Sequence, residues 1–115
     1  MVSQISITEQ AGKRILHLSG EFTGGYETND LRAAFQKFSE EKIQNAIINF
    51  EKVTYLNSTA LGILISANAA FVERGGKLVF VNLDSTIKNL FYVTKLNIVF
   101  PISENIEEAI KLISE

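Results

Sequence analysis

The sequence predicts an α/β fold, with a mostly parallel sheet of about five strands, an antiparallel first edge strand and about four helices packed against the sheet. Short apolar runs typical of buried strands alternate along the chain with segments whose apolar residues recur at helical spacing. Strands separated by helices pair in parallel through right-handed crossovers, whereas the first two strands are separated only by a short turn. The 115 residues, 46% of them hydrophobic, are expected to form a single domain spanning residues 1–115.

The first elements are a hairpin and a helix. Alternation of apolar and polar residues at Ile5 and Ile7, resumed over residues 14–18, predicts two strands joined across Gly12. Three glycines within residues 20–25 indicate a loop. From Thr28 onward, apolar residues at i, i+3, i+4 and i+7 predict an amphipathic helix. They are Leu31, Ala34, Phe35 and Phe38.

The middle of the chain predicts two buried strands around a second helix. Residues 46–50 form a nearly continuous apolar run, as in a strand covered on both faces, and residues 78–81 repeat this pattern. Between them, a helix is expected over about residues 58–74. It should end there because Gly75 and Gly76 stand where a helix needs a left-handed residue just past its last turn.

The last third predicts two more helices and one strand. Asp84 or Ser85 is expected to cap a third helix with apolar residues at 87, 90 and 91. Residues 98–100 predict a brief strand ended by Pro101, and Ser103 is expected to cap a terminal helix. The carboxyl ends of the strands, where sites tend to form in such sheets, should bring together residues 20–25, 51–59 and 82–85.

The composition excludes several functional classes. The chain has no cysteine and one histidine, which excludes disulfides, thiolate sites and histidine-rich metal clusters. Its net charge is −2 without a basic run, unlike a nucleic-acid-binding face. No secretory signal and no apolar stretch long enough to span a bilayer are found, so we expect a soluble, cytoplasmic protein without membrane insertion, metal or cofactor.

No catalytic residue is predicted. A Ser-His-Asp arrangement would have to use His17, which falls in the middle of a predicted strand and is expected to be a packed or surface residue. The glycines of residues 20–25 match neither a phosphate-binding loop nor a dinucleotide fingerprint. An enzyme or nucleotide-binding domain is therefore disfavoured; ATP or GTP binding near residues 20–25 and 57–59 stays open to a calorimetric titration.

A polar cluster, Asn57, Ser58 and Thr59, stands directly before the apolar second helix. These residue types accept hydrogen bonds from the free N–H groups of a first helical turn, and such caps contribute about 1 kcal/mol. The alternative to a structural cap is a phosphorylation site. A phosphate on Ser58 would be tolerated at the positive end of the helix dipole, yet its charge would weaken the binding of a partner at this edge.

Four stretches of the chain together match the pattern of a known family. They are LSGEFT at 18–23, AIINFEKVTYLNSTALG at 46–62, RGGKLVFVNL at 74–83 and IKNLFYVTKL at 87–96. With them the chain resembles the STAS domain and, more narrowly, the bacterial anti-sigma factor antagonists. The resemblance implies a STAS fold and a non-enzymatic protein that binds a serine-kinase anti-sigma factor and frees its sigma factor. It also implies that the kinase phosphorylates the antagonist, which then dissociates, and that a serine phosphatase resets it.

The resemblance also implies a set of site residues. The family motif at the second helix is usually Asp-Ser-Ser/Thr-Gly-Leu-Gly, which places the phosphoacceptor at Ser58. Two positions depart from it, since Asn57 replaces the Asp and Ala60 the first Gly. A second family motif, Gly-Glu-Leu-Asp, ends here in Thr23, so a second acid is absent. The expected partner-binding surroundings of the phosphosite are Glu21, Thr23, Asn57, Thr59, Ala60, Leu61 and Gly62, with the loop 82–85 beside them.

The missing carboxylates leave two hypotheses. Asn57 can orient a neighbouring hydroxyl but cannot act as a base. Either Ser58 is still phosphorylated, by a kinase that brings its own base, which we expect, or the domain binds its partner without being switched. In the second case the chain would be a STAS docking subunit of a sensory or transport assembly.

Overall fold

The computed structural model describes residues 4–114, which form a five-stranded sheet and five helices. The strands are β1 (Ile5–Gln10), β2 (Lys13–Phe22), β3 (Ala46–Leu56), β4 (Leu78–Val81) and β5 (Ile102–Ser103). The helices are α1 (Tyr26–Glu40), α2 (Ser58–Glu73), α3 (Ser85–Val93), α4 (Leu96–Val99) and α5 (Ile106–Ile113). The strands follow one another across the sheet in chain order, β1 antiparallel to β2 and the others parallel. The predicted fold class is confirmed, with one helix more than expected.

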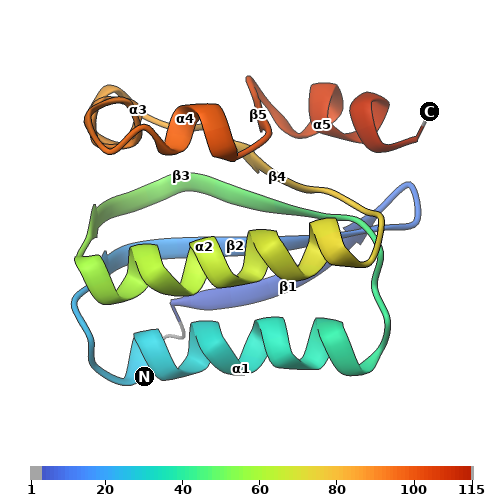
Figure 1. Cartoon of the computed structure of the whole chain (residues 1–115), viewed down its shortest axis with the longest axis horizontal. Helices are drawn as coiled ribbons and strands as arrows, with labels where there is room; N and C mark the ends of the chain where they lie inside the picture. The colour runs from blue at the N-terminus through green and yellow to red at the C-terminus, as the bar shows by residue number, and fades with distance from the viewer. Residues whose placement is uncertain (1–3, 115) are drawn as a thin grey trace.

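The helices cover the two faces of the sheet unequally, because alternate residues of each strand point to opposite faces. Leu16 and Ile48 belong to the large core cluster beneath α1, α2, α3 and α4. Their neighbours Ile15 and Ile47 belong to a smaller cluster covered by α5. Figure 1 shows α1 and α2 running side by side along the length of the sheet. No helix within residues 4–114 is long and apolar enough to cross a membrane.

Four phenylalanines fix α3 and α4 to the sheet. Phe80 of β4 stacks on Phe100, with 4.3 Å between ring centroids, and on Phe50 of β3 at 5.6 Å. Phe91 of α3 meets these three rings edge-on. Aromatic pairs in such geometries contribute about 0.5–1.5 kcal/mol beyond their buried area. Buried rings therefore help to hold the segment after β4, together with the buried Leu83, Ile87 and Leu96.

The strand predicted at residues 98–100 is wrong. Residues 96–99 form the short helix α4, and the last strand, β5, follows Pro101 instead of preceding it. One helical turn places Leu96 and Phe100 on the same side, and both are buried. Pro101 still joins the ladder, because its carbonyl accepts a hydrogen bond from Phe80 N (2.9 Å) and this needs no N–H of its own.

The cap predicted for the terminal helix is also wrong. Ser103 lies in β5, and the cap of α5 is Asn105, whose Oδ1 accepts a hydrogen bond from Glu108 N at 2.9 Å. For the third helix, which offered two candidates, the cap is Asp84.

Two strands run further than the sequence patterns indicated. β2 continues to Phe22 and β3 to Leu56, where the two strands are still paired. Register shifts around Ser19 and Gly20 interrupt the apolar alternation of β2, and Gly20 has a φ of +82° that suits glycine. The first helix starts at Tyr26, two residues before the predicted start. The carboxyl ends of β2 and β3 therefore project beyond β4, which pairs only with residues 46–49 of β3.

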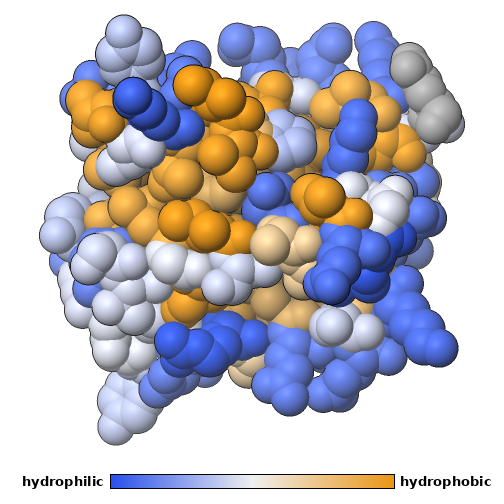
Figure 2. All heavy atoms as spheres, viewed as in Figure 1, coloured by the Kyte–Doolittle hydropathy of each residue, from blue (hydrophilic) through white to orange (hydrophobic). Residues whose placement is uncertain are grey.

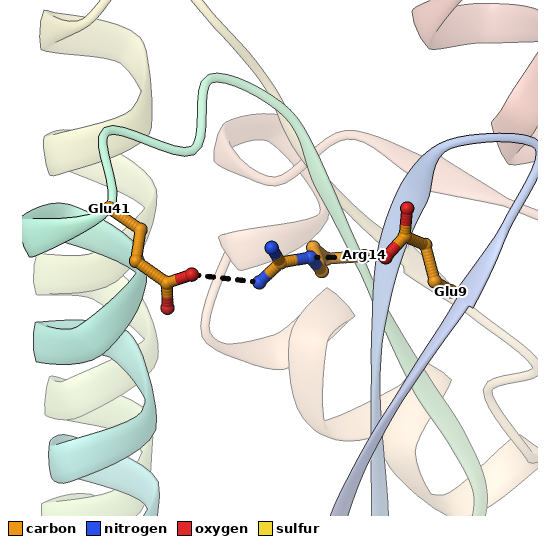
Figure 3. A network of polar contacts seen from close by, with 3 residues as sticks. All are labelled: Glu9, Arg14 and Glu41. Carbon is orange, nitrogen blue, oxygen red and sulfur yellow. Dashed lines mark hydrogen bonds and ion pairs between the residues drawn. The ribbon is translucent and has the colours of Figure 1, made fainter.

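An ion-pair cluster lies at the opposite end of β2 (Figure 3). Arg14 contacts Glu41, just past the end of α1, at 3.3 Å, and Glu9 of β1 at 3.7 Å. All three side chains are at least partly exposed, so each pair contributes at most about 1 kcal/mol. The cluster ties α1 to the hairpin, away from the site described next.

Candidate functional site

Asn57 joins the sheet to the second helix. Its backbone N–H donates to Phe22 O at 2.9 Å, which continues the pairing of β2 with β3. Its side-chain Oδ1 accepts from Ala60 N (2.9 Å) and its carbonyl accepts from Leu61 N (3.0 Å), so it is the N-cap of α2. Of the three residues predicted to cap α2, only Asn57 forms the cap. The hydroxyl groups of Ser58 and Thr59 take no part in it.

Ser58 and Thr59 form the exposed start of α2. Both residues are exposed, Leu61 is half-buried, and Ala60 is fully buried in the core. The first turn of α2 contains no acidic residue. The N–H groups of this turn and the dipole of a 16-residue helix favour a negative charge here. Among the expected site residues of α2, Ala60 therefore serves packing, and the exposed hydroxyl residues are Ser58 and Thr59.

The β2–α1 loop lies against this helix start and is organised by Glu27. The Glu27 carboxylate accepts hydrogen bonds from Thr23 N (2.8 Å), Gly25 N (3.1 Å) and Thr23 Oγ1 (3.2 Å). Backbone N–H donation, above all from Thr23, lowers the pKa of Glu27 from 4.5 to about 2. The first turn of α1 therefore carries a negative charge that is fixed against the loop, four residues after Thr23.

Gly24 brings the loop close to Asn57. Its φ is +99°, a left-handed conformation, and a Cβ added there would lie 3.4 Å from Asn57 Nδ2. The buried Thr28 holds the loop from below, since its Oγ1 accepts from Gly24 N at 2.9 Å. The structure thus unites the Thr23 loop with the start of α2, while the exposed Glu21 contributes its carbonyl to Gln4 Nε2 (2.9 Å) at the end of β2.

The loop 82–85, expected beside the start of α2, begins at a different point along the strands of the sheet. Asn82 Nδ2 donates to Asn49 Oδ1 at 2.9 Å, and Asn49 precedes the last residue of β3 by seven positions. The reason is the length of β4, which ends after four residues beside the first part of β3. Asn82 therefore lies beside Asn49 and not beside Asn57.

A groove of about 480 Å³ runs between α1 and α2, beginning with Thr59 and continuing to Ala70 on α2. Arg32 and Phe35 of α1 line its other side. Gly62 also lines it, and a Cβ added there would meet nothing within 4 Å. The exposed hydroxyl of Thr59 thus borders a hollow that carries a basic side chain.

The structure offers no catalytic arrangement around the lone histidine. His17 is half-buried in β2 and contacts Thr8 Oγ1 (2.7 Å) and Asn49 Nδ2 (3.0 Å), neither of which is a carboxylate. Asn49 Oδ1 already accepts from Asn82 and Glu51, so its amide donates to His17 Nδ1 and fixes the proton of the neutral ring on Nε2. Within residues 4–114 no group of three or more acidic or histidine side chains is placed to hold a metal ion.

Sequence reasoning missed Glu27 and Arg32 as parts of this region. The only signal for Glu27 was an acid in the first turn of a helix, four residues after Thr23. That spacing is common at helix starts and does not reveal bonds to preceding loop N–H groups. Arg32 reaches the groove only because α1 and α2 pack side by side, which is tertiary information.

Solved structures share this fold at low sequence identity. A candidate anti-sigma factor antagonist from Thermotoga maritima superposes with a TM-score of 0.88 at 16% identity, over 96% of this chain and 95% of that one. An anti-sigma factor antagonist from Mycobacterium paratuberculosis gives 0.83 at 19%, over 96% and 93%. The Bacillus cell fate determinant SpoIIAA in its phosphorylated form gives 0.72 at 18%, over 93% and 96%.

The sequence itself matches one family. The profile of the STAS domain covers residues 4–109, which includes every strand and the whole of the site from Glu21 to Gly62. The four stretches on which the resemblance of the sequence rested, 18–23, 46–62, 74–83 and 87–96, all lie within the matched residues. The chain belongs to the STAS domain family.

Proposed function

We propose that this STAS domain is a cytoplasmic anti-sigma factor antagonist. It binds a serine-kinase anti-sigma factor, frees the sigma factor, and loses affinity when the kinase phosphorylates Ser58; a serine phosphatase reverses the change. The chain acts by binding and is not itself an enzyme. Family membership and the similar structures of anti-sigma factor antagonists support this kind of partner.

One observation carries the proposal: the exposed residue Ser58 opens a 16-residue helix whose cap is formed by another residue. Because Asn57 supplies the cap, the Ser58 hydroxyl is free for chemistry without loss of the cap. A phosphate there would lie beside free N–H groups and the positive end of the helix dipole. The solved phosphorylated form of SpoIIAA, a structural neighbour, supports a phosphate in this fold.

The transfer step requires a base that the chain does not provide at Asn57. Ser58 Oγ attacks the γ-phosphorus of ATP bound to the kinase; an O–P bond forms, the bond to ADP breaks, and the hydroxyl proton must leave. An amide does not accept this proton, and Asn57 Oδ1 is already bound to Ala60 N. We therefore assign the base to the kinase.

Phosphorylation would end binding through charge. A phosphoserine carries about −1.5 to −2 charges at neutral pH. The proposed docking surface consists of Thr23, Asn57, Ser58, Thr59 and the half-buried Leu61. Covering this surface would remove water from the phosphate, a cost that the unmodified hydroxyl does not impose.

The test is incubation with the cognate kinase and ATP, followed by tandem mass spectrometry. We expect one phosphate on Ser58, none on Ser58→Ala, and an unchanged single phosphate on the matched control Thr59→Val. Ser58→Asp should bind the kinase at least about tenfold more weakly than Ser58→Ala. Absence of phosphate on Ser58, together with equal affinity of the two variants, would falsify the switch.

A second function is favoured by Asn57 itself, which replaces the family's acid and is engaged as a cap. In this alternative the domain is an unswitched docking subunit of a sensory or transport assembly. Purification from the native cell with a tag on this chain separates the two. A histidine-kinase-like ATPase as stoichiometric partner supports the antagonist, whereas a membrane ATPase supports the docking subunit.

A further inference from the structure

The aromatic side chains are divided by type between the core and the surface. The chain contains eight phenylalanines, three tyrosines and no tryptophan. The tyrosines are exposed, with exposed fractions of 82% for Tyr26, 50% for Tyr55 and 70% for Tyr92. Every phenylalanine is buried; they are Phe22, Phe35, Phe38, Phe50, Phe71, Phe80, Phe91 and Phe100. The core therefore uses phenylalanine alone, and the three amphipathic rings are left on the surface.

The fold gives the tyrosines neither a polar nor an aromatic partner. Within residues 4–114 no hydrogen bond reaches a tyrosine hydroxyl, and every close pair of rings joins two phenylalanines. A tyrosine has an apolar ring and a polar tip, which makes it one of the residue types enriched in protein interfaces. The unused rings and hydroxyls are therefore available to a partner.

Tyr26 and Tyr55 lie at the same end of the sheet as Ser58. Tyr55 precedes Ser58 by three residues, so their Cα atoms are at most about 11 Å apart. Tyr26 starts α1 two residues after Gly24, and a Cβ added at Gly24 would lie 3.4 Å from Asn57 Nδ2. An interface of ordinary size covers about 800 Å² on each partner, the area of a disc with a radius of about 16 Å. A partner of that size that covers Ser58 therefore comes within reach of both tyrosines.

The two segments that carry these tyrosines adjoin and are free of charge. Asn57 N donates to Phe22 O, which joins them, and residues 22–26 and 54–62 contain no Asp, Glu, Lys or Arg. Figure 2 shows residues of intermediate hydropathy, drawn pale, where Figure 1 draws the starts of α1 and α2. The centres of protein interfaces are depleted in charged residues and enriched in tyrosine, because uncharged groups cost less to remove from water. The composition of the two segments is thus that of an interface centre.

We propose that Tyr26 and Tyr55 are the two side chains that supply most of the affinity for the kinase partner at the Ser58 surface, an inference that rests on the proposed function. Each ring enters an apolar pocket of the kinase, with its hydroxyl at the polar edge of that pocket. A few buried aromatic residues carry most of the binding free energy of an interface. Because the rings come from separate segments, they also fix the orientation of Ser58 towards the ATP of the kinase. Tyr92 lies on α3, outside these segments.

The experiment measures the affinity of the cognate kinase for the chain by calorimetry, with ADP in place of ATP so that no phosphate is transferred. Tyr26→Ala and Tyr55→Ala should each bind about 30-fold more weakly than the unmodified chain. Tyr26→Phe and Tyr55→Phe keep the ring and should stay within about threefold. Val72→Ala, which truncates an exposed apolar residue of α2 about 21 Å along the helix from Ser58, is the control and should bind like the unmodified chain.

A second measurement needs no variant. In the unmodified chain with ¹³C-labelled tyrosine rings, addition of the kinase should shift the ring signals of both Tyr26 and Tyr55. If the kinase binds but these signals stay in place, or the alanine variants bind like Val72→Ala, the inference is wrong and the proposed function stands.

Two further outcomes also overturn the inference. Phenylalanine variants that lose as much affinity as the alanine variants would show that the hydroxyls carry the binding instead of the rings. A kinase that does not bind the unmodified chain at all removes the proposed function and this inference with it. The failure of the two tyrosines and the failure of the proposed function are thus read separately.

Discussion

The starts of α2 and α3 have nearly the same backbone geometry and different charge. Asn57 and Asp84 both adopt extended backbone, and in each the side-chain Oδ1 accepts a hydrogen bond from the N–H three residues later at 2.9 Å. Asp84 brings a carboxylate to its helix and Asn57 a neutral amide. A charged and a neutral side chain therefore form the same cap. Because Asn57 is neutral, the positive electrostatic potential at the first turn of α2 remains available to an added anion.

The largest expected effect follows from making the two caps alike. Asn57→Asp should raise the rate of phosphate transfer to Ser58 about tenfold, roughly 1.4 kcal/mol of barrier, because a carboxylate can take the hydroxyl proton. Single-turnover kinetics with the cognate kinase measure this rate. Asp84→Asn, the reverse exchange, serves as the control and should leave the rate unchanged. A rate for Asn57→Asp equal to that of the unmodified chain would show that the kinase base already suffices.

Removal of the charged cap should have the next largest effect. Asp84→Ala loses a hydrogen bond to Ile87 N and a favourable charge at the helix start, so the free energy of unfolding should fall by about 1–2 kcal/mol. Urea unfolding followed by circular dichroism measures the loss. Asp84→Asn keeps the bond and should lose only about half as much. A larger loss for Asp84→Asn than for Asp84→Ala would contradict this account.

Removal of the neutral cap should cost less. Asn57→Ala loses the bond to Ala60 N but no charge, and we expect the free energy of unfolding to fall by about 1 kcal/mol. The same urea titration checks the value, with Thr59→Ala as the control that leaves the cap intact. If Asn57→Ala proves more damaging than Asp84→Ala, contacts of Asn57 with the Gly24 loop outweigh the charge difference.

The smallest effect concerns Glu27, whose exposed position lets solvent screen its charge. Its pKa of about 2 in the folded chain lies below the ordinary 4.5, so its stabilising contribution is present above pH 4.5 and is lost as the pH falls towards 2. Urea unfolding at several pH values should show Glu27→Gln losing less stability between pH 5 and pH 2 than the unmodified chain. Glu73→Gln, at the end of α2, is the control. If Glu27→Gln and the unmodified chain lose the same stability as the pH falls, the three hydrogen bonds of the Glu27 carboxylate do not stabilise the fold.

Hydrophobic periodicity predicted those parts of the fold in which it coincides with burial. The helix at 26–40 follows its apolar spacing, and the strand at 78–81 follows its continuous apolar run. The helix at 58–73 lies between the polar cluster at 57–59 and the two glycines that were expected to bound it. The failure at residues 96–103 has a physical cause. Ile98 and Val99 have the β-branched side chains typical of strands, yet both are exposed, and the burial of Leu96 and Phe100 decides the helical turn. The two short elements at 96–99 and 102–103 depend on tertiary packing more than on local preference.

The candidate site was predictable only in part. Capping chemistry indicated that a residue of the 57–59 cluster would close the helix, but only the structure assigns that role to Asn57. Glu27 could not be identified because its partners lie in a loop whose path depends on a left-handed Gly24. The position of residues 82–85 could not be predicted without the length of β4. This strand ends with its buried apolar run and stops before the carboxyl end of β3.

The double attachment of Asn57 would determine how a phosphate on Ser58, if the proposed function holds, is sensed. The N–H of Asn57 belongs to the sheet, while its carbonyl and side chain belong to α2, so the first turn of the helix is anchored to Phe22 on a rigid support. An added charge therefore has little freedom to move the backbone. The two states of the domain should superpose closely, and a partner would distinguish them by electrostatic potential at a fixed surface.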